Sequence, residues 1–437
     1  MALAGAPVTT SAEAQGPVVY EGVASCAGST CHGRAEGNGK EVRQDEIALW
    51  QEPSSPSGAH SRAFAVLDSA RGRQIAASLG LGEPTRAAEC LGCHATPTRG
   101  ERGPRFQISD GVGCEACHGP ASGWIASHYA VGGTHSANVA AGMVPLDQPQ
   151  IRARVCLDCH FGSAANGQFV THRLMAAGHP RISFELDLFS ALQQHYDIDG
   201  DYVARKGRPS SVRLWAVGQA EAVRRSVDLF ARPDRGTWGV FPEFYFFDCH
   251  SCHRPITDGP ERKLTFETNP GRPIPFSMPP YNDENMIMLS TAARVLAPGQ
   301  AAGFDAASRD FHRAMSQGRE PAVAAARRLG ASAGALSDAL ARGGYGNDDA
   351  FRVIAAIADK TTEPRFTDYE GSAQAVMAVD TLLNAMVREG GVTVGAAAGI
   401  RANINQAYAA VRSPQTYNPP QFRAALASAA HSIEALR

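Results

Sequence analysis

Cysteine and histidine occur together in one repeated arrangement. The chain has 10 cysteines among its 437 residues. All of them fall into five pairs, four with the spacing C-x-x-C and one, in SCAGSTCHG, with four residues between the cysteines. A histidine follows the second cysteine of every pair. The paired cysteines are Cys26 and Cys31, Cys90 and Cys93, Cys114 and Cys117, Cys156 and Cys159, and Cys249 and Cys252, and the histidines are His32, His94, His118, His160 and His253.

Three kinds of chemistry use paired cysteines. Disulfides suit an even number of cysteines in an exported protein. Zinc suits the C-x₂-C-x₂₀-C-x₂-C spacing between Cys90 and Cys117. Covalent haem requires C-x-x-C-H, because two thiols add to the haem vinyl groups and the imidazole ligates the iron.

The histidines decide among these chemistries. Only 14 of the 437 residues are histidine, so finding one after all five pairs by chance has a probability on the order of 10⁻⁸. Disulfides and zinc ribbons do not require this residue. The pattern therefore predicts five covalently bound haem c groups. The first motif is included, because its longer loop can bulge while both sulfurs still reach the vinyl groups.

Histidines outside the motifs are candidates for the second axial ligand of each iron. His172 and His179 are seven residues apart, so on one helix they would share a face about 10.5 Å apart and could serve two neighbouring haems. Pro180 would end that helix. We expect His60, His128, His172 and His179 to be distal ligands, with His135 or His195 as the fifth. His250, His312 and His431 are expected to be structural.

Three stretches resemble a known family. GVGCEACHGPASGW, NGQFVTHRLMAAGHPRISFEL and FPEFYFFDCHSCHRP are similar to blocks of the cytochrome c-554-like class of periplasmic multihaem cytochromes. The resemblance covers roughly Val19 to Pro255. It implies that His128, His172 and His179 are axial ligands and that His60 reaches a later haem. Two features depart from the family pattern: the four-residue gap in the first motif, and Arg254, which stands where relatives often carry a second histidine.

The composition limits the other possibilities. A formal net charge of -2 leaves no basic footprint for nucleic acid. No apolar run approaches the roughly 18 residues that suggest a membrane span. Near the N-terminus, Ala12-Glu13-Ala14 has the small-residue pattern of a signal cleavage site, although a charged start is missing. We expect residues 1–18 to be a residual export signal or a flexible tail, and the protein to be periplasmic or extracellular.

The remaining sequence predicts a mainly α fold. Residues 19–258 should form a pentahaem domain of short helices and loops, with a helix at Val212–Pro233. Residues 259–284 are rich in proline and predict a connector. Residues 285–437 predict an antiparallel bundle, one helix of which would be capped by Asn347 and Asp348. The helical patterns beyond the connector are DENMIMLSTAARVL, AASRDFHRAMSQ, AVAAARRLGASAGALSDALA, NDDAFRVIAAIADK, SAQAVMAVDTLLNAMV and FRAALASAAHSIEAL. Oligomerisation through these helices is possible.

An electron-transfer cytochrome is the function favoured by these features. We find no separate catalytic motif, and the expected partners are redox proteins: another cytochrome, a quinol-linked membrane complex or a terminal reductase. One alternative is an oxidoreductase that acts on a small nitrogen or sulfur compound at a five-coordinate haem. Another is a subunit of an extracellular cytochrome filament. The supply of candidate distal histidines favours electron transfer over the enzyme.

Overall fold

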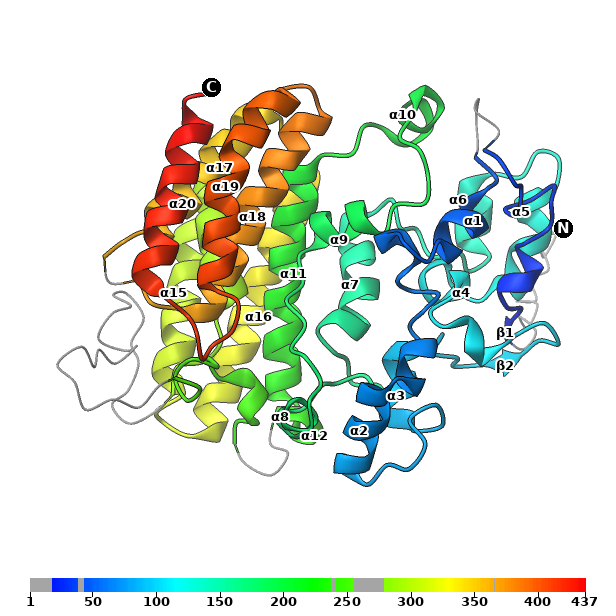
Figure 1. Ribbon diagram of the computed structural model, residues 1–437, viewed down its shortest axis with the longest axis horizontal. Helices are drawn as coiled ribbons and strands as arrows, with labels where there is room; N and C mark the ends of the chain where they lie inside the picture. Colours follow the sequence, from blue (N-terminus) through cyan, green and yellow to red (C-terminus); the bar gives the residue numbers. More distant parts are fainter. Residues whose placement is uncertain (1–17, 38–42, 237–240, 255–278, 365) are drawn as a thin grey trace, which may run out of the picture.

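The protein is described by a computed structural model that covers residues 18–37, 43–236, 241–254, 279–364 and 366–437. It is mainly helical, with short helices in the first half of the chain and long packed helices in the C-terminal half (Figure 1). The predicted fold class is therefore confirmed. The expected N-terminal signal or tail lies almost entirely outside the described residues, as does most of the proline-rich connector.

Short elements make up the first half of the chain. Strand β1 (Val19–Tyr20) pairs in parallel with β2 (Glu101–Arg102). The α-helices are α1 (Glu46–Gln51), α2 (Ala70–Leu79), α3 (Ala88–His94), α4 (Cys114–His118), α5 (Ile125–Tyr129), α6 (His135–Ala140), α7 (Pro149–His160), α8 (His172–Ala176), α9 (Leu186–Leu192) and α10 (Gly200–Lys206). The 3₁₀ turns are η1 (Val23–Ser25), η2 (Pro56–Gly58), η3 (Ala65–Asp68), η4 (Ile108–Asp110), η5 (Ala121–Gly123) and η6 (Phe244–Phe246).

Apolar packing is sparse in this half. One small buried cluster joins α7 to the chain around α9 and to α11, and its members are Ala153, Leu157, Phe184, Leu186 and Ala222. A segment that buries so little apolar surface has little hydrophobic stabilisation of its own. Such packing suits a segment whose interior is shared with large cofactors.

Helix α11 (Ser211–Ala231) lies between the two halves of the molecule (Figure 1). It matches the helix predicted at Val212–Pro233 and begins where the Ser210 hydroxyl accepts a hydrogen bond from the Arg213 amide. It packs against α7 on one side and against α16 in the bundle on the other. α12 (Pro233–Gly236) follows it directly.

The C-terminal half is a bundle around one large apolar core that also includes most of the buried face of α11. Its helices are α14 (Glu284–Leu296), α15 (Pro298–Ala314), α16 (Arg319–Arg342), α17 (Asn347–Thr361), α18 (Tyr369–Arg388), α19 (Val394–Ala410) and α20 (Pro419–Glu434). The sequence did not predict α19, because alanine and glycine outnumber large apolar residues in it and leave a weak apolar stripe.

One capping prediction was wrong. Helix α17 begins at Asn347, so Gly346 is its N-cap, and the Asp349 carboxylate accepts a hydrogen bond from the Gly346 amide at 3.0 Å. Asn347 and Asp348 lie in the first turn. Acidic side chains still suit this position, because a helix N-terminus carries partial positive charge.

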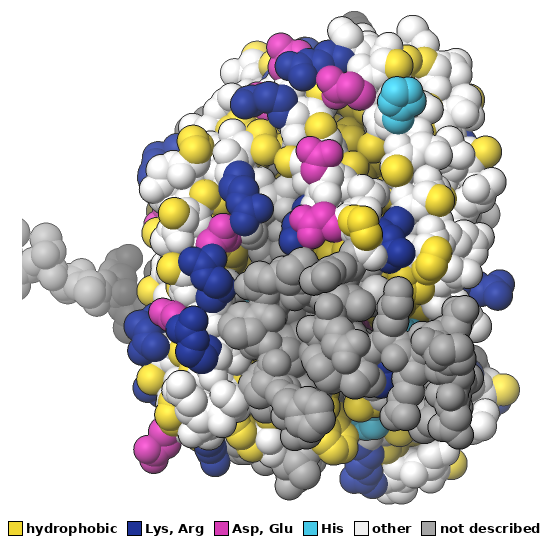
Figure 2. Space-filling view, turned by 90° about the vertical axis from the view of Figure 1, so that its left-hand side faces the viewer, with side chains coloured by type: hydrophobic (Ala, Val, Ile, Leu, Met, Phe, Trp, Pro, Cys, Tyr) yellow, Lys and Arg dark blue, Asp and Glu magenta, His cyan; other side chains and the backbone are white. Residues whose placement is uncertain are grey.

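The surface of the bundle is mixed in charge. On the side that lies at the left in Figure 1, basic, acidic and apolar side chains intermingle wherever atoms are coloured (Figure 2). Within the described residues, no helix is both long and apolar enough to cross a membrane.

Candidate haem-binding sites

Three attachment motifs lie at the ends of helices. Helix α3 ends at His94, α4 runs from Cys114 to His118, and the last turn of α7 ends at His160. Because residues three apart share a helix face, each C-x-x-C places both thiols on one side with the histidine beside them. All ten cysteines are free thiols, so the predicted attachment residues are chemically available.

The wide first motif keeps the backbone contact of a normal one. In the fifth motif the His253 amide donates to the carbonyl of the first cysteine, Cys249, at 2.8 Å. In the first motif the His32 amide donates to the carbonyl of Cys26 at 3.2 Å, although two more residues intervene. The extra residues bulge outward. In both motifs the histidine amide therefore reaches the carbonyl of the first cysteine.

Each attachment histidine faces a second histidine. The ring centres lie 6.1 Å apart for His32 and His128, 6.1 Å for His60 and His160, 6.3 Å for His94 and His179, 6.4 Å for His118 and His195, and 6.1 Å for His172 and His253. A metal–imidazole bond is about 2 Å long and the ring centre lies about 1 Å beyond the nitrogen, so two imidazoles on opposite sides of one metal have centres about 6 Å apart. The residues therefore fit an iron between each pair.

Hydrogen bonds on the far side of several rings support this fit. Nδ1 of His94 donates to the Ala63 carbonyl at 2.8 Å, and Nδ1 of His179 donates to the Pro180 carbonyl at 2.7 Å. Nδ1 of His32 contacts the Glu46 carboxylate at 2.9 Å. A histidine that uses Nδ1 as a donor leaves Nε2 as the nitrogen free to bind metal.

Burial keeps the central rings neutral. It lowers the pKa of His118 to about 3 and the pKa of His160 to about 4, because a buried imidazolium loses its hydration. Only the neutral ring has a lone pair for a metal. His32 differs, since its hydrogen bond to Glu46 raises its pKa.

Four of the predicted distal histidines, His60, His128, His172 and His179, lie opposite histidines of the motifs. Of the two further candidates, His195 lies opposite His118. His135 instead lies 3.2 Å from the Asp147 carboxylate on the surface. Of the histidines expected to be structural, His312 is buried beside Asp283, His250 donates to the Pro414 carbonyl, and His431 is exposed.

The helix predicted to carry both His172 and His179 is shorter than expected. Helix α8 ends at Ala176, and Gly178 adopts a φ of 114°, a conformation that favours glycine. His179 therefore leaves the helix and points to a different attachment histidine from His172. The two residues still face separate sites, but a turn rather than a helix face separates them.

Contacts between the motifs show which of them lie next to one another in space. The Cys26 and Cys114 thiols are hydrogen-bond partners, so the first and third motifs adjoin. The Cys93 thiol lies 4.0 Å from the Cys159 carbonyl, and the Cys159 thiol lies 3.8 Å from the Gly92 carbonyl, so the second and fourth adjoin. The thiols of Cys117 and Cys156 interact electrostatically, which links the third motif to the fourth.

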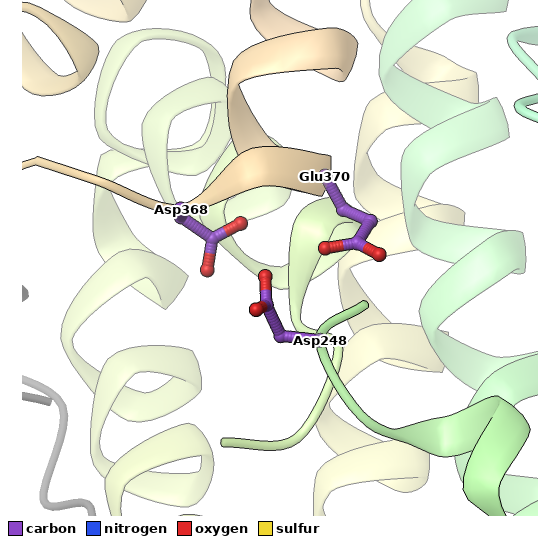
Figure 3. Close-up of side chains that lie close together, drawn as sticks. All are labelled: Asp248, Asp368 and Glu370. Atoms are coloured by element: carbon purple, nitrogen blue, oxygen red, sulfur yellow. The ribbon is translucent and has the colours of Figure 1, made fainter. Parts of the chain in front are cut away.

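The fifth motif is anchored on the bundle. Asp248 accepts a hydrogen bond from the Ser251 amide at 2.7 Å, and Glu370 accepts one from the Cys249 amide at 2.9 Å. Figure 3 shows Asp248 on the loop facing Asp368 and Glu370 at the start of α18. Their carboxylate oxygens lie within 4.8 Å of one another, and all three residues are buried.

Arg181 offsets part of this negative charge. Its guanidinium lies 3.3 Å from Glu370 and 3.2 Å from Glu284, and it reaches the Cys249 sulfur at 3.3 Å. The sequence signalled neither Arg181 nor Glu370 as a supporting residue. Their partners are far away along the chain, so only the fold reveals the contact.

Paired thiols with facing imidazoles on short helices fit the class of multihaem c-type cytochromes. The comparison with family models agrees: residues 25–119 match the family described as "Cytochrome c554 and c-prime". This segment is a cytochrome c554 family domain, and the match implies covalent haem c and electron transport. Searches of curated proteins and of solved structures found no match.

Proposed function

We propose that the protein is a pentahaem electron carrier in which every iron has two histidine ligands. The attachment histidines His32, His94, His118, His160 and His253 would pair with His128, His179, His195, His60 and His172, in that order. The observation that carries this proposal is the set of five ring pairs, whose centres all lie between 6.1 and 6.4 Å apart.

When bound, haem c supplies one-electron chemistry. The residues of the chain do the rest: they hold the thiols, orient the imidazoles through Nδ1 hydrogen bonds, and exclude water from the central sites. Two imidazoles on one iron give a low-spin centre that moves electrons with little rearrangement.

The contacts between motifs support a linear order of sites. The first motif adjoins the third, the third is linked to the fourth, and the fourth adjoins the second. The fifth follows the second, because Arg181, two residues after His179, reaches the Cys249 sulfur at 3.3 Å. The order would thus be first, third, fourth, second and fifth. Cys31 and Cys252 are both exposed, which suits exchange of electrons at the two ends.

Electron transfer is favoured over substrate reduction for a specific reason. Each of the five attachment histidines has a facing histidine, so every proposed iron has a candidate sixth ligand. A substrate would have to displace one of them. We place the protein in the periplasm or outside the cell, where covalent haem attachment and partner cytochromes would be found. We also propose that the bundle helps to hold the fifth motif in position.

Spectroscopy of the oxidised holoprotein tests the proposal. Low-temperature electron paramagnetic resonance should give low-spin signals that integrate to five irons per chain, with no high-spin component. Any high-spin iron would contradict the ligand set and would favour an open catalytic haem. The haem content is counted separately by intact mass, so a missing haem and a missing ligand are distinguishable.

A further inference from the structure

A groove of about 620 Å³ lies on the opposite side of α7 from the proposed haem sites. It is lined by residues of α7, α11 and α16, with Arg232 and Pro233 at one end. Leu157, Val227 and Ala326 give it an apolar floor. Its volume is in the range of about 300–1,000 Å³ that small-molecule sites occupy.

Arginine dominates its polar lining. Arg154, Arg224, Arg225, Arg232 and Arg327 line the groove, whereas its carboxylates are Glu221 and Asp228. Asp158 and Asp234 pair with Arg225 and Arg232 from just outside the lining, so five guanidinium groups meet four carboxylates and one positive charge is in excess. Guanidinium groups bind phosphate and carboxylate oxygens in a fork geometry, which makes this lining suited to anions.

A buried carboxylate holds two of these arginines in place. The Glu221 side chain is only 3% exposed and accepts from Arg154 Nε at 3.1 Å and from Arg224 Nη1 at 2.9 Å. The Ser337 hydroxyl donates to it at 2.6 Å. Two guanidiniums thus share one carboxylate and keep one positive charge uncompensated. Because they are already fixed, a ligand would lose little side-chain entropy by binding them.

The other arginines differ in how firmly they are held. Arg225 is fixed by Asp158 at 2.8 Å and by the Gly162 carbonyl. Arg232 pairs with Asp234 at 3.1 Å in an exposed contact that solvent weakens. Arg327 is exposed and has no hydrogen bond or ion pair with any described residue. Arg327 is therefore the guanidinium most available to a ligand.

The backbone of α16 is adapted to this arrangement. A side-chain carbon at Gly334 would lie 3.4 Å from Arg224 Nε, and one at Gly330 would lie 3.1 Å from the Val227 side chain. These glycines let α11 and Arg224 lie close against α16. Small residues here leave space for the arginine side chain beside the groove.

From this lining we infer that the groove binds a small anion that carries phosphate or carboxylate groups. Helix α7 separates this site from the haem sites, since Arg154 and Leu157 line the groove whereas Cys156, Cys159 and His160 occupy the other face of the helix. The inference does not depend on the number of haems or on their ligands.

Isothermal titration calorimetry of the holoprotein at low salt tests this site, with pyrophosphate and tricarballylate as probes. Wild-type protein should bind at least one probe with one site per chain, and the preferred probe distinguishes phosphate from carboxylate ligands. Arg327→Glu should weaken that binding by about tenfold or more, because the reversal replaces attraction by repulsion inside the groove.

Arg328→Glu is the matched control. It makes the same change in net charge one residue further along α16, and Arg328 is exposed but lines a different, smaller groove. The affinity of this variant for the probe should stay within about threefold of wild type, since exposed charges outside the site are screened. If both variants weaken binding of the probe equally, the effect comes from the overall charge of the protein, and the inference is overturned. The absence of binding of either probe to wild-type protein would also overturn it.

Discussion

The backbone amide of Cys249 donates a hydrogen bond of 2.9 Å to the carboxylate of Glu370, a residue 121 positions further along the chain. This bond joins the last attachment motif to the first turn of α18 in the bundle. Arg181 contacts both residues, since it pairs with Glu370 and reaches the Cys249 sulfur. The C-terminal helices therefore help to set the position of the fifth proposed haem.

Replacing Glu370 should weaken this junction. Glu370→Ala removes the acceptor for the Cys249 amide and one of the two buried carboxylates paired with Arg181. Breaking a buried ion pair typically costs about 3 kcal/mol or more, so the free energy of unfolding should fall by about 3 kcal/mol. Denaturant titration of the holoprotein measures this change.

Glu434→Ala provides the comparison for Glu370. Glu434 forms an exposed pair with Arg437, its side chain being 51% exposed. Exposed pairs contribute about 0–1 kcal/mol, so this variant should stay close to wild type. Similar unfolding energies for the two variants would mean that Glu370 does not secure the junction.

His195 should be required for the ligand set, and His135 should not. His195→Ala should convert one low-spin haem to high-spin without loss of covalent haem, because it removes the imidazole that faces His118 at 6.4 Å. Paramagnetic resonance of the oxidised protein measures the spin states. In His135→Ala, which alters a surface contact with Asp147, the spectrum should not change. If the high-spin signal appears in His135→Ala and not in His195→Ala, then His135 is the iron ligand and His195 is not.

The wide first motif should carry haem. Intact mass of the exported protein should correspond to five haems per chain. The double variant Cys26→Ala, Cys31→Ala should carry one fewer, because neither thiol remains to form a thioether bond with the haem. The hydrogen bond from the His32 amide to the Cys26 carbonyl is one that the fifth motif also makes, between His253 and Cys249. A wild-type mass equivalent to four haems would exclude attachment at the wide motif.

Glu185 should make stability depend on pH. Burial, with a further contribution from Asp187, raises the pKa of Glu185 to about 8 from its ordinary 4.5. Between these values the folded protein keeps a proton that the unfolded chain has lost. Its contribution to stability is therefore complete below pH 4.5 and is lost as the pH rises through 8.

The melting temperature of wild type relative to Glu185→Gln tests this dependence. The side chain of the variant is neutral at every pH. The melting temperature of wild type minus that of the variant should therefore fall by about 5 °C between pH 5 and pH 9. A difference that does not vary with pH would show that Glu185 is ionised throughout this range in the folded protein.

Local sequence was sufficient to propose the attachment motifs and to predict most helices. Covalent attachment depends on residues a few positions apart, so C-x-x-C-H can be read without the fold. The long C-terminal helices were predictable because their apolar residues recur with helical period. Helix α19 was missed for the converse reason, since few large apolar residues mark its buried face.

The sequence by itself determined the number of attachment motifs, the ten cysteines and five histidines in them, and the mainly helical class. The tertiary structure alone decided that His195 rather than His135 faces His118, that α8 stops at Ala176 and sends His179 toward His94, and that Arg181 and Glu370 fix the fifth motif. The physical reason is the separation along the chain of the residues that interact. A motif is a local property, whereas a facing imidazole or a buried ion pair joins residues that meet only when the whole chain has packed.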